Sequence, residues 1–256
     1  MEKTVLTREI VETKGWDKLE VITADMLQGY TEIGIYAFKQ CPVKEITLPN
    51  TVRIIDTYAF SSTPLKRVVL PETITQIYYS AFDCCYELEE VIFKGERIEF
   101  IGSYSFANCR QLKYLKLPKN IGIFNDTAFC DCPNIASKFE IQDYSKPVVA
   151  YKGFNKDMTC MNGFQYEEGK TYEFEGEPKL CECGFHACLS PLNVFRYYCQ
   201  FFPYNSCKYH EVILEGVSKE RQRDTKVVAK KITIGRELTF NDMVEIFIKR
   251  VNLEEK

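Results

Sequence analysis

Residues 181–188 place three cysteines and one histidine in a short segment, as Cys181, Cys183, His186 and Cys188. Cysteine thiolates and imidazole nitrogens bind structural zinc, usually in pairs spaced by two to four residues. On an extended strand Cys181 and Cys183 face the same side, so the spacing is compatible with a zinc site. The alternative is a corner between strands in which small cysteine side chains are buried as apolar groups. We favour this second interpretation and expect neither a metal nor a cofactor.

Motifs for catalysis are few in this sequence. It has two histidines, His186 and His210, and it lacks a glycine-rich phosphate loop, a His-Glu-x-x-His motif and a nucleophile elbow. Acid–base chemistry would then depend on carboxylates, lysine or cysteine. We therefore expect no catalytic residues and a function without turnover.

One enzyme hypothesis stays open. The order of Tyr151–Gly153, a Gly184–Ala187 segment before a helix, and Glu211 on a later strand resembles the layout of ADP-ribosyltransferases. That resemblance implies a dinucleotide bound between an early Arg or His and a late Glu. Two departures weigh against it, because Lys152 stands where an Arg is expected and a Ser-Thr-Ser run is absent. An ADP-ribosyltransferase-like enzyme or remnant is thus the alternative to a binding function.

A short cationic segment is the candidate contact for nucleic acid. Lys219, Arg221 and Arg223 lie within it and could bind phosphate. The net charge of the chain is −3, so there is no general basic field for nucleic acid. Such runs are usually solvated surface turns. We therefore expect the chain not to bind nucleic acid directly.

The first half of the chain contains a sequence repeat. A phenylalanine recurs at spacings of 22 to 24 residues, preceded by a small residue and followed at the third position by a small or sulfur-bearing one. The phenylalanines are Phe38, Phe60, Phe82, Phe106 and Phe129, and the following residues are Cys41, Thr63, Cys85, Cys109 and Cys132. A period in this range is typical of a solenoid, whose coils bury their apolar faces only against one another. We expect stacked Phe rings and a buried column of thiols.

A Leu-x-x-Leu-x-Leu pattern lies between the phenylalanines. It predicts a short strand whose alternate side chains point into the coil. The copies are Val43–Ile46–Leu48, Leu65–Val68–Leu70, Leu88–Val91–Phe93 and Leu112–Leu115–Leu117. The whole frame resembles the BspA-like leucine-rich repeats, whose hallmark run Ile-Gly-x-x-Ala-Phe-x-x-Cys stands at residues 33–41. This resemblance covers roughly residues 20–139 and implies a binding scaffold.

Residues 148–236 resemble a domain of unknown function that is common in phages and prophages. The segments that carry the resemblance are Tyr151–Phe154, Gly163–Tyr172, Gly184–Cys188 and Asp224–Ala229. It implies a mobile-element origin and brings no established activity.

The predicted fold class is mixed α/β. We expect an N-terminal cap over residues 1–32, a leucine-rich-repeat solenoid of about five repeats with a parallel β-sheet over 33–139, and a small α+β domain over 148–256. The repeat pattern is lost after Phe129, because Lys138 and Glu140 occupy positions that should point inward. In the second domain we expect strands at 148–151, 172–174, 179–183, 209–214 and 227–234, and helices at 190–200 and 239–251.

The predicted location is cytoplasmic. The chain has 12 cysteines, and its first residues lack the apolar core of a secretion signal, so reduced thiols are expected. No apolar run approaches the ~20 residues of a membrane-spanning helix, so we expect no membrane association.

The strongest functional signal lies between the inward positions of the repeat strands, where side chains must share one outward face. One row is Thr47, Val69, Ile92 and Lys116, and the adjacent row is Glu45, Arg67, Glu90 and Tyr114. Val69, Ile92 and Tyr114 form an apolar centre with charged residues around it, which is typical of a protein-binding site. The alternative is that the second domain covers this face.

The sequence therefore predicts a non-catalytic protein-binding module of phage or mobile-element origin. Its partner would be a host protein or ribonucleoprotein, and it would act as an inhibitor of a host defence complex such as a CRISPR effector. A virion-associated structural adaptor is a further alternative.

Overall fold

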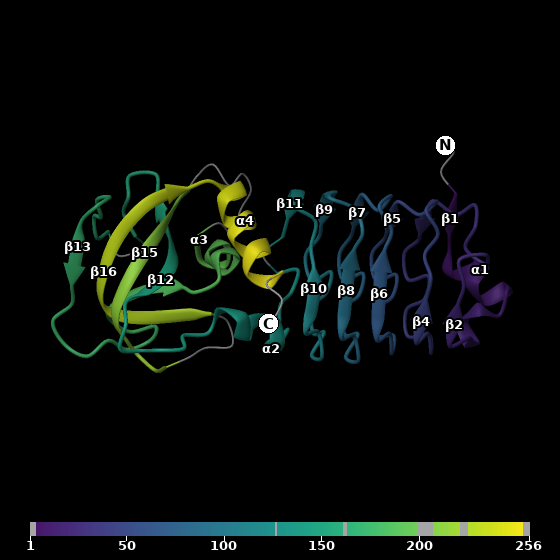
Figure 1. Cartoon of the computed structure of the whole chain (residues 1–256), viewed down its shortest axis with the longest axis horizontal. Coiled ribbons are helices and arrows are strands. Elements are labelled where there is room, and N and C mark those ends of the chain that lie inside the picture. Colours follow the sequence, from purple (N-terminus) through teal and green to yellow (C-terminus); the bar gives the residue numbers. More distant parts are fainter. Residues whose placement is uncertain (1–3, 126, 161–162, 199–206, 221–224, 253–256) are drawn as a thin grey trace. The chain divides into compact units, whose positions relative to one another are not determined.

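Two compact units make up the chain in the computed structural model shown in Figure 1. Unit 1 comprises residues 1–135 and 251–256, and unit 2 comprises residues 136–250. The structure describes residues 4–125, 127–160, 163–198, 207–220 and 225–252.

Unit 1 is a stack of coils, each of which contributes one short strand to each of two rows of parallel strands (Figure 1). The first strands form a six-stranded sheet of β1 (Val5–Leu6), β3 (Glu32–Ile33), β5 (Ile54–Ile55), β7 (Gln76–Ile77), β9 (Arg97–Ile101) and β11 (Asn120–Phe124). The second strands are β2 (Val21–Ile22) paired with β4 (Glu45–Ile46), and a three-stranded sheet of β6 (Arg67–Leu70), β8 (Glu90–Phe93) and β10 (Tyr114–Lys116). The predicted solenoid with parallel strands is confirmed, and the six-stranded sheet adds a second face that the sequence did not predict.

Stacked phenylalanine rings fill the interior of the coils. Phe38, Phe60, Phe82 and Phe106 are fully buried. Their ring centroids lie 5.0 to 5.4 Å apart and nearly parallel, and Phe129 continues the stack at 5.3 Å from Phe106. The predicted ladder is confirmed.

The residue three positions after each phenylalanine ties neighbouring coils together. The thiols of Cys85, Cys109 and Cys132 donate to the carbonyl oxygens of the preceding coil's Phe60, Phe82 and Phe106, at 3.1 to 3.4 Å. Burial raises the pKa of the Cys85 thiol to about 12, so the thiol keeps the proton that it donates. The predicted buried column of thiols is thus confirmed, with Thr63 in place of a cysteine in one coil.

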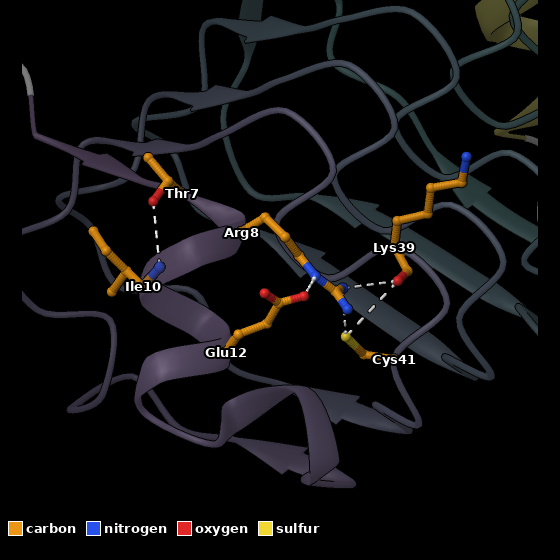
Figure 2. Close-up of polar contacts among 6 residues, drawn as sticks. All are labelled: Thr7, Arg8, Ile10, Glu12, Lys39 and Cys41. Carbon is orange, nitrogen blue, oxygen red and sulfur yellow. Dashed lines mark hydrogen bonds and ion pairs between the residues drawn. The ribbon is translucent and has the colours of Figure 1, made fainter.

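The N-terminal residues continue both rows of strands and close the end of the column. Helix α1 (Arg8–Thr13) is capped by Thr7, whose hydroxyl accepts from the Ile10 backbone N–H at 3.3 Å (Figure 2). Arg8 donates from Nη1 to the Lys39 carbonyl at 3.0 Å and to the Cys41 thiol at 3.2 Å. Its Nε lies 2.7 Å from a Glu12 carboxylate oxygen. Arg8 thereby contacts the first thiol of the column, and a short 3-10 helix η1 (Trp16–Lys18) leads on to β2.

Unit 2 is built on a sheet with the order β13-β16-β14-β12-β15 and an additional pairing of β15 with β16. The strands are β12 (Val148–Asn155), β13 (Thr171–Glu173), β14 (Phe185–Cys188), β15 (Cys207–Val217) and β16 (Lys226–Leu238). Because β16 pairs with both β14 and β15, and β12 also pairs with both, these four strands form a closed ring of pairings. Helix α2 (Pro133–Ala136) lies at the boundary of the two units, and the helical segments that follow are η2 (Ser137–Phe139), η3 (Pro191–Val194), α3 (Phe195–Tyr198) and α4 (Phe240–Val251).

Three predictions for this half of the chain were wrong in detail. Residues 179–183 form a turn with a single bridge between Lys179 and Cys183, in which Cys181 has a φ of +65°. The helix expected from Ser190 is split into η3 and α3, and the Ser190 side chain makes no capping hydrogen bond. The Ser190 backbone N–H donates to the Thr225 hydroxyl at 2.8 Å, a contact separate from the expected side-chain cap. Strands β15 and β16 extend beyond the predicted ranges at both ends.

Candidate protein-binding face

The outward side chains of β6, β8 and β10 lie in register across the sheet. Arg67 pairs with Glu90 and Glu90 with Tyr114, while Val69 pairs with Ile92 and Ile92 with Lys116. The residues between them, including Val68, Val91 and Leu115, are buried in the coils. The geometry of the two predicted rows is therefore confirmed over these three strands.

The rows continue toward the N-terminus on β4 and β2. Glu45 lies on β4 and Thr47 directly after it, and both are exposed. Glu45 pairs with Val21 of β2, whose side chain is 49% exposed. Val21 was not predicted to lie on this face, because the first residues of the chain fit the repeat frame poorly.

A third row of charged side chains flanks the other two. It consists of Glu20, Lys44, Lys66, Glu89 and Lys113. Backbone hydrogen bonds place Lys44 beside Glu20, Glu89 beside Lys66, and Lys113 beside Glu89. Lys44 and Glu20 form an ion pair at 2.7 Å, as do Lys113 and Glu89, and the Lys113 ammonium lowers the pKa of the Glu89 carboxyl. This row was missed, although its lysines and glutamate recur with the same period as the phenylalanines.

The centre of this surface is apolar. Val69 and Ile92 are half-buried side by side, and Tyr114 is 37% exposed in the adjacent row. Arg67 forms an ion pair with Glu90 beside them. We call the outward surface of β2, β4, β6, β8 and β10 the outer face. It combines an apolar strip with charged side chains of both signs, as the cores and rims of protein interfaces do.

The cysteine–histidine motif does not assemble as a zinc site in the part of the chain that the structure describes. The Cys181 backbone N–H donates to His186 Nε2 at 2.8 Å, so this nitrogen already accepts a hydrogen bond. Burial, helped by the nearby Lys226 and Lys152 ammonium groups, lowers the pKa of the His186 imidazole to about 4. Cys181 is exposed whereas Cys188 is buried, and no group of three or more metal-binding side chains was found among the described residues.

Lys152, the residue at the position of the ADP-ribosyltransferase arginine, points into the interior of unit 2. Its side chain is 4% exposed, and its Nζ donates to the His186 carbonyl at 2.8 Å. The Phe154 and Tyr166 rings each have their centroid 5.7 Å from this nitrogen. These contacts place the ammonium against a carbonyl and two rings, which does not match a lysine that reaches out to a bound dinucleotide.

Lys219 is exposed on the loop after β15, whereas Arg221 and Arg223 lie outside the described residues. The nucleic-acid contact expected from this segment therefore stays a prediction. Within the described ranges, none of the helices is both long and apolar enough to cross a membrane.

Comparisons with known proteins bear on both halves of the chain. Residues 148–246 match a domain of unknown function (DUF7666). A comparison with curated proteins found no match.

Two solved structures are similar to this chain. One is a leucine-rich cell surface protein from Faecalibacterium prausnitzii A2-165, with 22% identity, coverage of 46% of this chain and 41% of that chain, and a TM-score of 0.33. The other is the pneumococcal vaccine antigen PcpA, with 24% identity, coverage of 44% and 27%, and a TM-score of 0.35. The chain thus spans less than half the length of either protein, and these likenesses carry no argument about function.

Residues 17–150, more than half of the chain, match the BspA type leucine-rich repeat region in six copies. The same residues supply the stacked coils, the phenylalanine ladder and the outer face. The chain therefore belongs to the BspA-type leucine-rich-repeat family.

Proposed function

We propose that this protein is a non-catalytic binding module whose outer face contacts a protein partner. The observation that carries the proposal is the in-register apolar strip of Val69, Ile92 and Tyr114 beside charged side chains. Leucine-rich repeats in general present such extended surfaces for binding.

The physical basis is the burial of apolar area that the solenoid leaves partly in water. Fully burying a Val or Ile side chain stabilises a complex by about 1.5–3 kcal/mol, and Val69 and Ile92 are already half-buried. Their remaining contribution is therefore smaller, and Tyr114 adds an aromatic side chain of the kind that is enriched at interface centres. The charged side chains beside the strip would set the orientation of the partner and exclude mismatched surfaces.

The partner is proposed to be a host protein or ribonucleoprotein in the cytoplasm. The finer hypothesis, an inhibitor of a host defence complex carried by a phage, depends solely on the resemblance of residues 148–236 to a domain common in phages. The ADP-ribosyltransferase-like enzyme and the virion adaptor stay alternatives, to be tested by NAD binding and by recovery of the protein in purified particles.

The outer face can be tested with one substitution at its centre and one control on the other sheet. Ile92→Glu places a charge in the apolar strip without touching an inward position, so capture of the partner from a host lysate should fall at least about tenfold, or ~1.4 kcal/mol. Ile123→Glu makes the same change on β11 of the six-stranded sheet, where the isoleucine is 44% exposed, and should leave capture unchanged.

The double variant Arg221→Ala and Arg223→Ala should also have little effect on capture of the partner. Equal capture by wild type and a folded Ile92→Glu variant would refute the proposal, and loss of capture in the Arg221 and Arg223 variant would move the site to unit 2. Unfolding of the Ile92→Glu variant would show that Ile92 belongs to the buried core, which would equally refute it.

A further inference from the structure

A buried amine and a partly exposed thiol are in contact in unit 2. Lys152 lies in the middle of β12 with 4% of its surface exposed. Its Nζ donates to the His186 carbonyl at 2.8 Å and also forms a hydrogen bond with the Cys160 thiol. The neighbouring Phe154 and Tyr166 rings leave this nitrogen few other directions. The amine is therefore held in contact with the Cys160 thiol.

The chain segment that follows β12 holds Cys160 at this position. An antiparallel bridge joins Thr159 to Gln165, and the Cys160 backbone N–H donates to the Phe164 carbonyl at 3.2 Å. The Asn155 N–H donates to the Thr159 carbonyl at 2.9 Å, which fixes the start of the same turn to the end of β12. These bonds hold the Cys160 backbone close to the end of β12, from which its thiol reaches the amine.

Access to the two groups differs, and so does their chemistry. Cys160 is a partly exposed residue, while Lys152 is shielded from water. Burial lowers the pKa of the Lys152 ammonium, which increases the fraction of neutral, nucleophilic amine at a given pH. Cys188, another thiol near Lys152, is only 3% exposed. An oxidant from solution should therefore meet Cys160 first.

We propose that Cys160 and Lys152 form a reversible covalent modification site, in which peroxide links the sulfur to the amine nitrogen as a sulfenamide. In the first step the Cys160 thiol and hydrogen peroxide give a sulfenic acid and one water, so sulfur loses two electrons and peroxide is reduced. In the second step the neutral Lys152 amine attacks the sulfur, an S–N bond forms, and the hydroxyl leaves with the amine proton as a second water. Sulfenic acids condense with nitrogen nucleophiles in this way.

The consequence is local to unit 2. The bond joins the turn at residue 160 to the middle of β12, and it replaces a buried ammonium with an uncharged nitrogen. Holding the two reactants in contact favours their reaction over competing attack by molecules in solution. Two equivalents of a small thiol would break the bond, restore both side chains and leave a disulfide of the reductant.

Peptide mapping of the full chain tests the proposal. The reduced protein is treated with hydrogen peroxide, alkylated and digested with trypsin. Trypsin should no longer cleave after Lys152, and residues 139–156 should be linked to residues 157–170 with a mass two hydrogen atoms below the sum of the two peptides. Dithiothreitol added before alkylation should restore cleavage after Lys152 and alkylation of Cys160.

Matched variants identify the atoms involved. Cys160→Ser should abolish the linked peptide, and Cys188→Ser should retain it. Lys152→Met should leave Cys160 open to trapping as a sulfenic acid by dimedone. Normal cleavage after Lys152 in the oxidised wild type, or a link from Lys152 to Cys188 instead, would overturn the proposal. The wild-type map decides the question even if a variant fails to fold.

Discussion

The replacement Phe82→Ala measures how much the aromatic ladder contributes to the stability of unit 1. Phe82 is 0% exposed, and its ring lies 5.2 Å from the Phe60 ring and 5.0 Å from the Phe106 ring, nearly parallel to both. Removing a buried Phe side chain costs about 3–5 kcal/mol. Aromatic pairs add about 0.5–1.5 kcal/mol each beyond their buried area, and two are lost here, so the upper part of that range is expected.

Urea denaturation followed by circular dichroism would give this free energy, and a thermal melt should shift by about 6–20 °C. Phe129→Ala is the matched control, because Phe129 occupies the same position in the last copy but is partly exposed, and its loss should cost clearly less. A Phe82→Ala melt within a degree or two of wild type would refute the ladder as the source of stability. Equal losses of unfolding free energy for Phe82→Ala and Phe129→Ala would show that the burial of a ladder phenylalanine does not determine its contribution to stability.

Three further predictions concern the cap, the thiols and metal. Arg8→Met removes the contacts to Lys39 and Cys41 and should lower the unfolding free energy by about 1–2 kcal/mol, while Lys18→Met, at an exposed position, should change it by less than about 0.5 kcal/mol in urea titrations. The folded Cys85 thiol has its pKa raised from 9.0 to about 12, so its contribution to stability is complete below pH 9 and is lost as pH rises toward 12, by about 1.4 kcal/mol per pH unit. Cys85→Thr should show a shallower alkaline loss, and an identical slope would contradict the assignment. Elemental analysis should find no stoichiometric zinc and a chelator should leave the melting temperature unchanged, whereas one zinc per chain that disappears on changing Cys181 and Cys183 to Ser would contradict this.

The period of the sequence was sufficient to predict the coils and their interior. Phe82 and Cys85 occupy positions that have the same role in each repeat, so the register of the repeats can be read from the sequence alone. The six-stranded sheet was missed for a physical reason, because strands such as Ile54–Ile55 are two residues long and too short to show an alternating pattern. In unit 2 the Ser190 side chain makes no capping hydrogen bond, and the segment after it begins as the 3-10 helix η3 instead of one continuous α-helix.

The candidate sites were only partly visible in the sequence. The rows through Arg67 and Ile92 follow from strand alternation, which fixes the side on which each residue lies. The flanking charged row was not considered, because residues such as Lys113 look like ordinary solvated side chains until a partner like Glu89 is found beside them. Lys152 could not be recognised as buried, since lysines are almost never fully buried and its hydrogen bond is to the carbonyl of His186, 34 residues away.

The alternation of a single strand separates stability from recognition in unit 1, and two neighbouring residues of β8 can test this separation. Val91 points into the coil and is fully buried, whereas Ile92 points outward and is only half-buried. Val91→Ala should lower the unfolding free energy by about 2 kcal/mol and leave the affinity of the folded protein unchanged. Ile92→Glu should do the reverse, weakening binding with little loss of stability. Because a solenoid coil buries its apolar side chains only against its neighbours, a surface substitution need not disturb the interior. If Val91→Ala instead weakened binding in fully folded protein, the outer face would depend on the packing beneath it, and the two roles would not be separable by strand alternation.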